Sequence, residues 1–182
     1  MADATNTSRS IVDSVLMMDT NSKIGHIQEF DILLFDVMPE TIDGLKIDGV
    51  EHLSSAGDNI TFLPNVAYTL KGIIFGYHSR VLVMALLSKK KSTNAIMRVD
   101  TGSPYTFLTE ETFKAMGINV EDLPDDECDI LINGQRTTVY RSKAHFQDMN
   151  ILGANFLRMC EVFLDYPNKK VQITVKPLLV NE

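Results

Sequence analysis

The sequence has no tryptophan, few cysteines and histidines, and no long apolar run. Its longest unbroken apolar stretch is Val81–Leu87, whereas a membrane-spanning helix needs about 20 such residues. The first ten residues are polar, and no apolar segment follows a basic start, so the pattern of a secretory signal peptide is absent as well. These absences predict an intracellular, cytoplasmic protein with no membrane partner, or a piece excised from a longer precursor.

The scarcity of metal-binding side chains argues against a metal centre. The two cysteines, Cys128 and Cys160, do not form a CxxC pair. The four histidines are spread along the chain, with no HExxH motif or comparable cluster. We therefore expect no metal ion, no disulfide framework and no cofactor.

Positive charge is also in deficit. The chain carries 24 acidic and 17 basic residues, which gives a net charge of -7. Such a balance repels phosphate backbones and argues against nucleic-acid binding. The one basic run, Lys89–Lys91, lies between Ser88 and Ser92 and predicts the tip of a solvated turn.

The N-terminal part shows turns and short apolar stretches without a motif that carries chemistry. Residues 1–20 are predicted to form a flexible tail. In residues 21–79, the apolar stretch Phe30–Met38 predicts a strand, and Asp43-Gly44 and Asp48-Gly49 predict turns. Because no linker rich in Gly, Ser or Pro follows, we expect this extension to pack on the core as extra strands. The alternative is a prosegment that is released on activation.

The C-terminal part predicts a β-rich fold with two short helices. Strands are expected at Val81–Leu87 and Ala95–Val99, joined by a polar turn. Thr109 is a predicted helix N-cap, and Gly117 is the predicted end of that helix. The further predicted elements are a hairpin around Asn133-Gly134 with arms at Ile130–Ile132 and Thr137–Tyr140, a short helix at Asn155–Cys160 and a strand at Val171–Val175.

One stretch of this part suits catalysis. The strand that ends at Val99 delivers Asp100 into a tight turn, Asp100-Thr101-Gly102-Ser103. Such an acid suits peptide hydrolysis by two carboxyl groups, one of which takes a proton from water while its protonated partner donates to the scissile carbonyl oxygen. Two carboxyl groups about 3 Å apart share one proton. On its own, however, Asp-Thr-Gly is more often a structural turn than a catalytic one.

A second motif accompanies the first. Ile151-Leu152-Gly153 ends 53 positions after Asp100 and precedes a predicted short helix. With these two motifs, residues 80–176 resemble the retropepsin family, the retroviral-type aspartic proteases. The family pattern is an apolar residue before Asp-Thr-Gly, and later two apolar residues and a glycine. The resemblance implies a mainly β, single-lobe acid-protease barrel with two short helices. Residues 21–79 would be a β-rich extension of this domain, and residues 177–182 a C-terminal tail.

The resemblance also implies a role for each residue of the first motif. Asp100 would be the catalytic carboxylate, Thr101 would brace the turn, and Gly102 and Ser103 would present their backbone to a protein or peptide substrate. Since Asp-Thr-Gly occurs once in the sequence, the second carboxylate would come from a second copy of the chain. The implied partner is therefore another copy, in a homodimer.

The sequence departs from the family in the flap that covers the cleft. The acidic stretch Asn119–Asp129, which contains no glycine, leaves room only for a very short flap, unless the hairpin at Asn133-Gly134 serves instead. In retroviral members, an acid and an arginine pair at the positions held here by Pro104 and Ala154. Their joint absence suits a cellular or transposon-derived member better than a close retroviral relative, although a viral polyprotein product stays possible.

Three functions are compatible with these patterns. The first is an active homodimeric aspartic endopeptidase with a dyad formed by two copies of Asp100. The second is a retropepsin-like binding or assembly domain that cleaves weakly or not at all because it lacks a proper flap. The third is an unrelated β protein in which Asp-Thr-Gly is only a turn.

Overall fold

The computed structural model describes residues 37–57, 60–63, 66–143 and 147–176, which fall within one compact unit of the chain, Asp36–Glu182. The predicted tails at 1–20 and 177–182 lie outside the described residues. So does most of the predicted strand Phe30–Met38, whose last two residues do not form a strand. No helix of the described part is long and apolar enough to cross a membrane.

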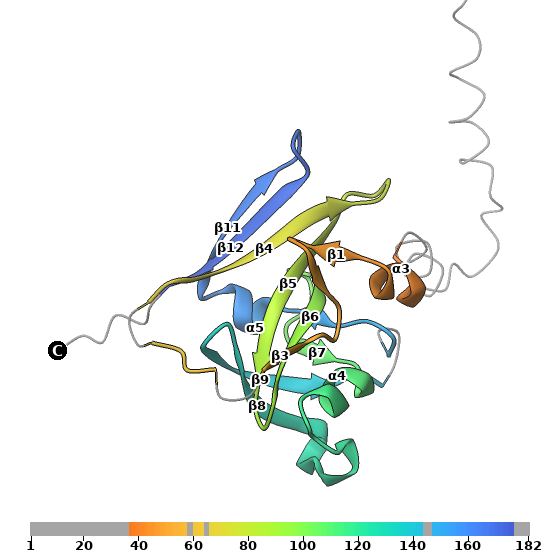
Figure 1. Cartoon of the computed structure of the whole chain (residues 1–182), viewed down its shortest axis with the longest axis vertical. Helices are drawn as coiled ribbons and strands as arrows, with labels where there is room; N and C mark the ends of the chain where they lie inside the picture. Colours follow the sequence, from red (N-terminus) through yellow and green to blue (C-terminus); the bar gives the residue numbers. More distant parts are fainter. Residues whose placement is uncertain (1–36, 58–59, 64–65, 144–146, 177–182) are drawn as a thin grey trace, which may run out of the picture. The chain divides into compact units, whose positions relative to one another are not determined.

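Six strands close on themselves to form a barrel (Figure 1). Its first two strands, β5 (Arg80–Ser88) and β6 (Ser92–Val99), form the predicted hairpin. From β5 the ring runs through β8 (Glu127–Ile132), β9 (Gln135–Arg141), β7 (Thr106–Leu108), β10 (Ile151–Leu152) and back to β6. The pairs β7–β9 and β10–β6 are parallel. Closure leaves these six strands without an open edge, which is how barrels avoid unpaired backbone groups. The expected mainly β barrel with short helices is confirmed.

The predicted hairpin between β8 and β9 is also present. Asn133 and Gly134 both have positive φ angles, 44° and 83°, as a two-residue turn of this type requires. The Asn133 side chain accepts a hydrogen bond from the Leu86 N–H at 2.9 Å, and its own N–H donates to the Leu86 carbonyl at 2.8 Å. The turn is therefore fastened to β5.

On the side of β5, the sheet continues beyond the barrel through three further strands. β4 (Tyr68–Phe75) pairs antiparallel with β5, β12 (Lys170–Val175) with β4, and β11 (Cys160–Asp165) with β12. Figure 1 shows β11 and β12 as an arm that reaches away from the barrel. The close approach of β4 to β5 depends on Gly72, because a Cβ there would lie 2.2 Å from the Leu82 carbonyl oxygen.

Helices and turns occupy the connections. The helices are α3 (Pro39–Asp43), α4 (Glu110–Ala115) and α5 (Ala154–Leu157), with 3₁₀ turns at η1 (Val120–Asp122) and η2 (Pro124–Asp126). Thr109 caps α4 as predicted, since its side chain accepts from the Thr112 N–H, and Gly117 follows the helix at φ 74°. The helix predicted at Asn155–Cys160 is shorter and starts one residue earlier. Cys160 instead begins β11, a strand that the sequence did not predict.

Two apolar clusters lie on opposite sides of the β5–β6 hairpin. Strand β5 is buried almost throughout because both of its faces are covered. The first cluster fills the barrel and includes Val83, Ala85, Leu87, Met97, Phe113 and Phe156. The second cluster lies on the other face and includes Leu82, Met84, Ile96 and Ile151.

Residues from the N-terminal part contribute to the second cluster. Val37, Ile42 and Ile47 are almost fully buried against it. Three short strands also come from this part, β1 (Lys46–Ile47), β2 (Val50–Glu51) and β3 (Ser55–Gly57). Strands β1 and β2 pair with each other across the predicted Asp48-Gly49 turn, and β3 pairs with β6.

Candidate active site

The Asp100 loop begins where β6 leaves the barrel wall. Parallel pairing sets Val99 beside Leu152 of β10. The Asp100 N–H donates to the Leu152 carbonyl at 3.1 Å, which extends the pairing by one residue. The first and second sequence motifs are therefore adjacent in space, and the start of the loop is fixed by backbone hydrogen bonds.

The carboxylate of Asp100 is half-buried and faces its own loop. It accepts a hydrogen bond from the Gly102 N–H at 2.9 Å, and the Ser103 N–H donates to the Asp100 carbonyl at 3.2 Å. Thr101 and Gly102 are exposed, and Ser103 is buried. The Ser103 hydroxyl donates to the Tyr105 carbonyl at 2.8 Å, so in this chain Ser103 braces the turn.

Gly153 packs directly against this loop. A Cβ at Gly153 would lie 2.0 Å from the Tyr105 carbonyl oxygen and 3.0 Å from that of Ser103. Only a residue without a side chain fits between these carbonyl groups. The adjacent Ala154 N–H donates to the Ser103 carbonyl at 2.8 Å. The Ile151–Gly153 motif and the residue after it therefore hold the Asp100 loop in place.

The positions of the missing acid–arginine pair are joined by the main chain instead. The Asn155 N–H, next to Ala154, donates to the Pro104 carbonyl at 3.1 Å. Together with the Ala154–Ser103 hydrogen bond, this contact ties α5 to the loop without a charged pair. The loop therefore does not depend on ionic strength for its attachment to α5.

Sequence reasoning missed a polar side chain beneath the site. Asn150, which is 2% exposed, accepts hydrogen bonds from the Thr109 N–H and the Thr112 hydroxyl, each at 2.9 Å. Its amide nitrogen donates to the Ile96 carbonyl at 3.3 Å. One side chain thus joins the start of α4, strand β6 and the residue before β10. An asparagine directly before the apolar–apolar–glycine motif was the only available signal.

A second missed contact lies on the other side of the loop. The Thr106 hydroxyl donates to the Asn155 side-chain oxygen at 2.7 Å and accepts from the Gly153 N–H at 3.1 Å. The Asn155 amide nitrogen then donates to the Thr138 carbonyl at 2.8 Å. This chain of hydrogen bonds fixes α5 to β7 and β9, and with it the glycine that supports the Asp100 loop.

The stretch expected to hold a short flap forms compact turns. Residues 120–126 fold as η1 and η2, and Asp126 forms ion pairs with Lys143 and Arg141. The acidic residues here do not join the Asp100 loop in any contact within the described part of the chain.

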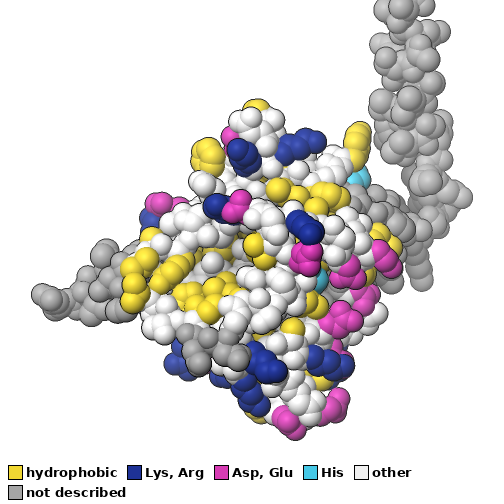
Figure 2. Space-filling model, in the orientation of Figure 1, with side chains coloured by type: hydrophobic (Ala, Val, Ile, Leu, Met, Phe, Trp, Pro, Cys, Tyr) yellow, Lys and Arg dark blue, Asp and Glu magenta, His cyan; other side chains and the backbone are white. Residues whose placement is uncertain are grey.

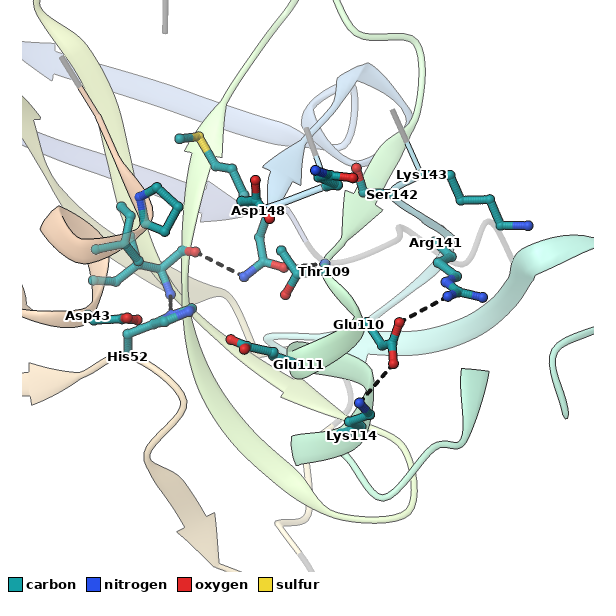
Figure 3. Close-up of a pocket in the computed structure, with 16 residues that line it drawn as sticks. Asp43, His52, Thr109, Glu110, Glu111, Lys114, Arg141, Ser142, Lys143 and Asp148 are labelled. Carbon is teal, nitrogen blue, oxygen red and sulfur yellow. Dashed lines mark hydrogen bonds and ion pairs between the residues drawn. The ribbon is translucent and has the colours of Figure 1, made fainter. Parts of the chain in front are cut away.

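A cavity of about 830 Å³ lies away from Asp100. Figure 3 shows Asp43 and His52 on one side of it, and Glu110 between Lys114 and Arg141 on the other. The Lys114 ammonium, followed by Arg141, lowers the pKa of the Glu110 carboxyl. Burial lowers the pKa of His52, whose Nδ1 accepts from the Ile96 N–H at 3.0 Å. These charges largely compensate one another, and Asp100 is not among the lining residues.

Within the described residues, we find neither a metal site nor a reactive thiol that could serve as the catalytic group in place of Asp100. No group of three or more His, Cys, Asp or Glu side chains is arranged there to hold a metal ion. Both cysteines are free, and burial raises the pKa of Cys128 and raises that of Cys160 to about 11. A thiol with such a pKa is a poor nucleophile at neutral pH.

No protein-family model matches the chain, and no curated protein matches it. Among solved structures, the fold is similar to the crystal structure of a retropepsin-like aspartic protease from Rickettsia conorii. The sequences are 14% identical, the TM-score is 0.45, and the alignment covers 64% of this chain and 97% of the other.

Proposed function

We propose that the chain is an aspartic endopeptidase that works as a homodimer, with Asp100 of each copy forming the catalytic dyad. One observation carries the proposal. The Asp-Thr-Gly loop and the Ile-Leu-Gly motif, far apart in sequence, are joined by parallel strand pairing and by the hydrogen bond from the Asp100 N–H to the Leu152 carbonyl. A turn with a purely local structural role would not need this second segment.

The loop geometry suits the chemistry. The Asp100 carboxylate lies at the end of a rigid strand and is partly exposed, so another carboxyl group has room to approach it. In the dyad, one carboxylate takes a proton from water, and the water oxygen attacks the scissile carbonyl carbon. The protonated partner donates its proton to the carbonyl oxygen. The tetrahedral intermediate then collapses as the amide nitrogen is protonated and leaves.

A second copy is part of this proposal because the chain has one Asp-Thr-Gly sequence. A two-fold axis between two such loops would bring two equivalent carboxyl groups together. The pair would share a single proton and work while one group is protonated and the other is not. We therefore expect greatest activity at mildly acidic pH.

The test is a peptidase assay on a mixed peptide library with Asp100→Asn as the critical variant. Asn keeps the size of the side chain and an oxygen that can accept the Gly102 N–H, so the fold should persist while cleavage disappears. Asp122→Asn is the matched control, because Asp122 is exposed and lies in η1. Normal cleavage by Asp100→Asn would contradict the proposal.

A second candidate function is a binding or assembly domain that cleaves weakly or not at all. The observation in its favour is that the stretch before β8 forms 3₁₀ turns instead of a hairpin that could close over Asp100. Without such a cover the site excludes water poorly, which raises the barrier. Peptide binding without turnover, in both wild-type protein and Asp100→Asn, would favour this function.

A further inference from the structure

A second cavity lies directly beside the Asp100 loop, with a volume of about 520 Å³. Pro104 and Tyr105 line it from the loop, and its other walls come from strand β9 and the end of helix α5. Tyr105 stands five positions after Asp100, so the two Cα atoms are at most about 18 Å apart. Five residues of an extended peptide span the same distance. A peptide held at Asp100 can therefore reach this cavity, which we call the Tyr105 pocket.

The pocket has an aromatic wall. The Tyr105 side chain is 48% exposed, and its ring lies against that of Tyr140 on β9, with 4.9 Å between the ring centroids. Met159, after α5, adds an apolar side chain to the lining. These surfaces can cover the apolar stem of a ligand side chain, so the polar groups of the pocket decide which side chain it accepts.

Most polar side chains of β9 in the pocket already have partners. The Thr138 hydroxyl donates to the Asp129 carboxylate at 2.7 Å, and the Arg136 guanidinium forms an ion pair with the same carboxylate. The Tyr140 hydroxyl donates to the Glu127 carboxylate, which raises the pKa of the phenol. A ligand could use these groups only at the expense of an existing contact.

Two hydrogen-bonding side chains of the pocket remain unused. The Asn155 amide is committed through both its oxygen and its nitrogen. Within the described part of the chain, however, neither the Arg158 guanidinium nor the Tyr105 hydroxyl has a hydrogen-bonding or ionic partner. Arginine carries five N–H donors in a fixed fork, and the phenol carries one O–H donor. A carboxylate offers acceptors to both and matches the arginine fork with two parallel hydrogen bonds.

The charge of the lining also favours a carboxylate. The Tyr105 pocket is lined by two arginines and by no Asp or Glu. The cavity of Figure 3 differs, because Asp43, Glu111 and Asp148 line it and would repel an acidic ligand. Figure 2 shows acidic side chains gathered on the side of the molecule where α3 and α4 lie. Of these two cavities, the one beside the Asp100 loop is the one that suits a negative group.

We propose that the Tyr105 pocket binds an acidic side chain of the substrate, a Glu or Asp several residues away from the bond to be cleaved. This inference rests on the proposed function, which brings a peptide to Asp100. The carboxylate accepts hydrogen bonds from the Arg158 guanidinium and the Tyr105 hydroxyl, and its stem lies against the Tyr105 ring and Met159. Arg158 and Tyr105 would thus determine specificity without touching the scissile bond.

Peptide cleavage tests the specificity. The substrates are blocked decapeptides with an apolar middle and a single Glu placed in turn at each flanking position, each compared with its Gln and Lys counterparts. At one flanking position, Glu should lower KM about fivefold relative to Gln, as expected of an exposed bidentate pair. The value of kcat should not change, because the contact is equally strong in the ground state and the transition state.

Substitutions of Arg158 assign the preference to the pocket. Arg158→Gln should abolish the difference between the Glu and Gln peptides, and Arg158→Lys should keep part of it, since lysine retains the charge but not the fork. The matched control is Lys46→Gln, which removes an exposed cation of β1 that is paired with Glu51 and should leave the preference unchanged. A Glu preference that persists in Arg158→Gln would overturn the proposal.

Binding to Asp100→Asn lets the two proposals fail separately. Because the chain has no tryptophan, a tryptophan at one end of each peptide reports binding through its fluorescence. Asp100→Asn should bind the Glu peptide about fivefold more tightly than the Gln peptide, and the added Arg158→Gln change should remove the difference.

Equal or undetectable binding of the two peptides would overturn the pocket, as would tighter binding of the Lys peptide. Selective binding of the Glu peptide by a wild-type protein that cleaves nothing would support the pocket and count against the peptidase. Cleavage through Asp100 with no preference for Glu in either assay would do the reverse.

Discussion

Two strand edges in this molecule differ in how their backbone groups are used. Where β6 meets β10, the hydrogen bonds continue past the strand end and hold the Asp100 loop in place. Along the outer edge of β11, three residues direct their backbone groups away from the sheet. The first edge builds a carboxylate into a rigid frame, whereas the second is open to another strand.

The largest effect is expected where the N-terminal part meets the barrel. Removing residues 1–79 would expose Leu82, Ile96 and Ile151 and leave the edge of β12 that faces β4 unpaired. We expect this truncated chain to lose cooperative unfolding.

Limited proteolysis of the full chain checks the same contact. The stretch around residues 75–80 should resist cleavage until the whole domain unfolds. Clean cutting there, with a stable fragment from about Arg80 onward, would instead indicate a removable prosegment.

Gly153→Ala should have the next largest effect. The added Cβ would meet the Tyr105 carbonyl at 2.0 Å, so either the Asp100 loop or β10 has to move. We expect a loss of about 3 kcal/mol in the free energy of unfolding, measured by urea denaturation. Gly44→Ala is the matched control, because its Cβ would meet only the Glu40 carbonyl, at 3.6 Å. Equal stability of the two variants would contradict the close packing at Gly153.

Asn150→Ala should destabilise the region beneath the loop by about 2 kcal/mol, because it leaves the buried Thr109 N–H and Ile96 carbonyl without partners. Asn119→Ala removes only the exposed cap of η1 and should cost about 0.5 kcal/mol. Urea denaturation of both variants checks this order. A smaller loss for Asn150→Ala than for Asn119→Ala would contradict the network.

The smallest effect on the free energy of unfolding is expected from a substitution of His52. Its pKa in the folded protein is lowered by burial, with Asp43 acting in the opposite direction. The unfolded chain, with an ordinary histidine pKa of about 6.5, therefore binds more protons as the pH falls below that value. The free energy of unfolding should decrease from about pH 6.5 toward the lower pKa of the folded state. In His52→Gln, the free energy of unfolding should therefore decrease less between pH 7.5 and pH 5.5 than in the wild-type protein. An equal decrease in both proteins would contradict this prediction.

The sequence predicted most where local chemistry decides the structure. The β5–β6 hairpin, the turn at Asn133-Gly134 and the Thr109 cap follow from residue types within a few positions. The pairing of the Asp100 loop with Ile151–Gly153 was accessible only through two motifs 53 positions apart, taken together. Strand β11 was missed because it lies at the exposed edge of the sheet and shows no alternation of buried and exposed residues, although its partner β12 follows after a short turn. Asn150 was missed because one buried amide has no periodic pattern around it.

The most direct test of the two-copy dyad is the activity of mixed dimers. Wild-type protein and Asp100→Asn would be mixed in equal amounts, exchanged by unfolding and refolding, and assayed for peptide cleavage. If each site needs Asp100 from both copies, only dimers with two wild-type chains cleave, and activity falls to about one quarter of that of the same total amount of wild-type protein. A mixture with Asp122→Asn should keep full activity. Activity of about one half in the Asp100→Asn mixture would mean that each chain carries a complete site, and would contradict the account.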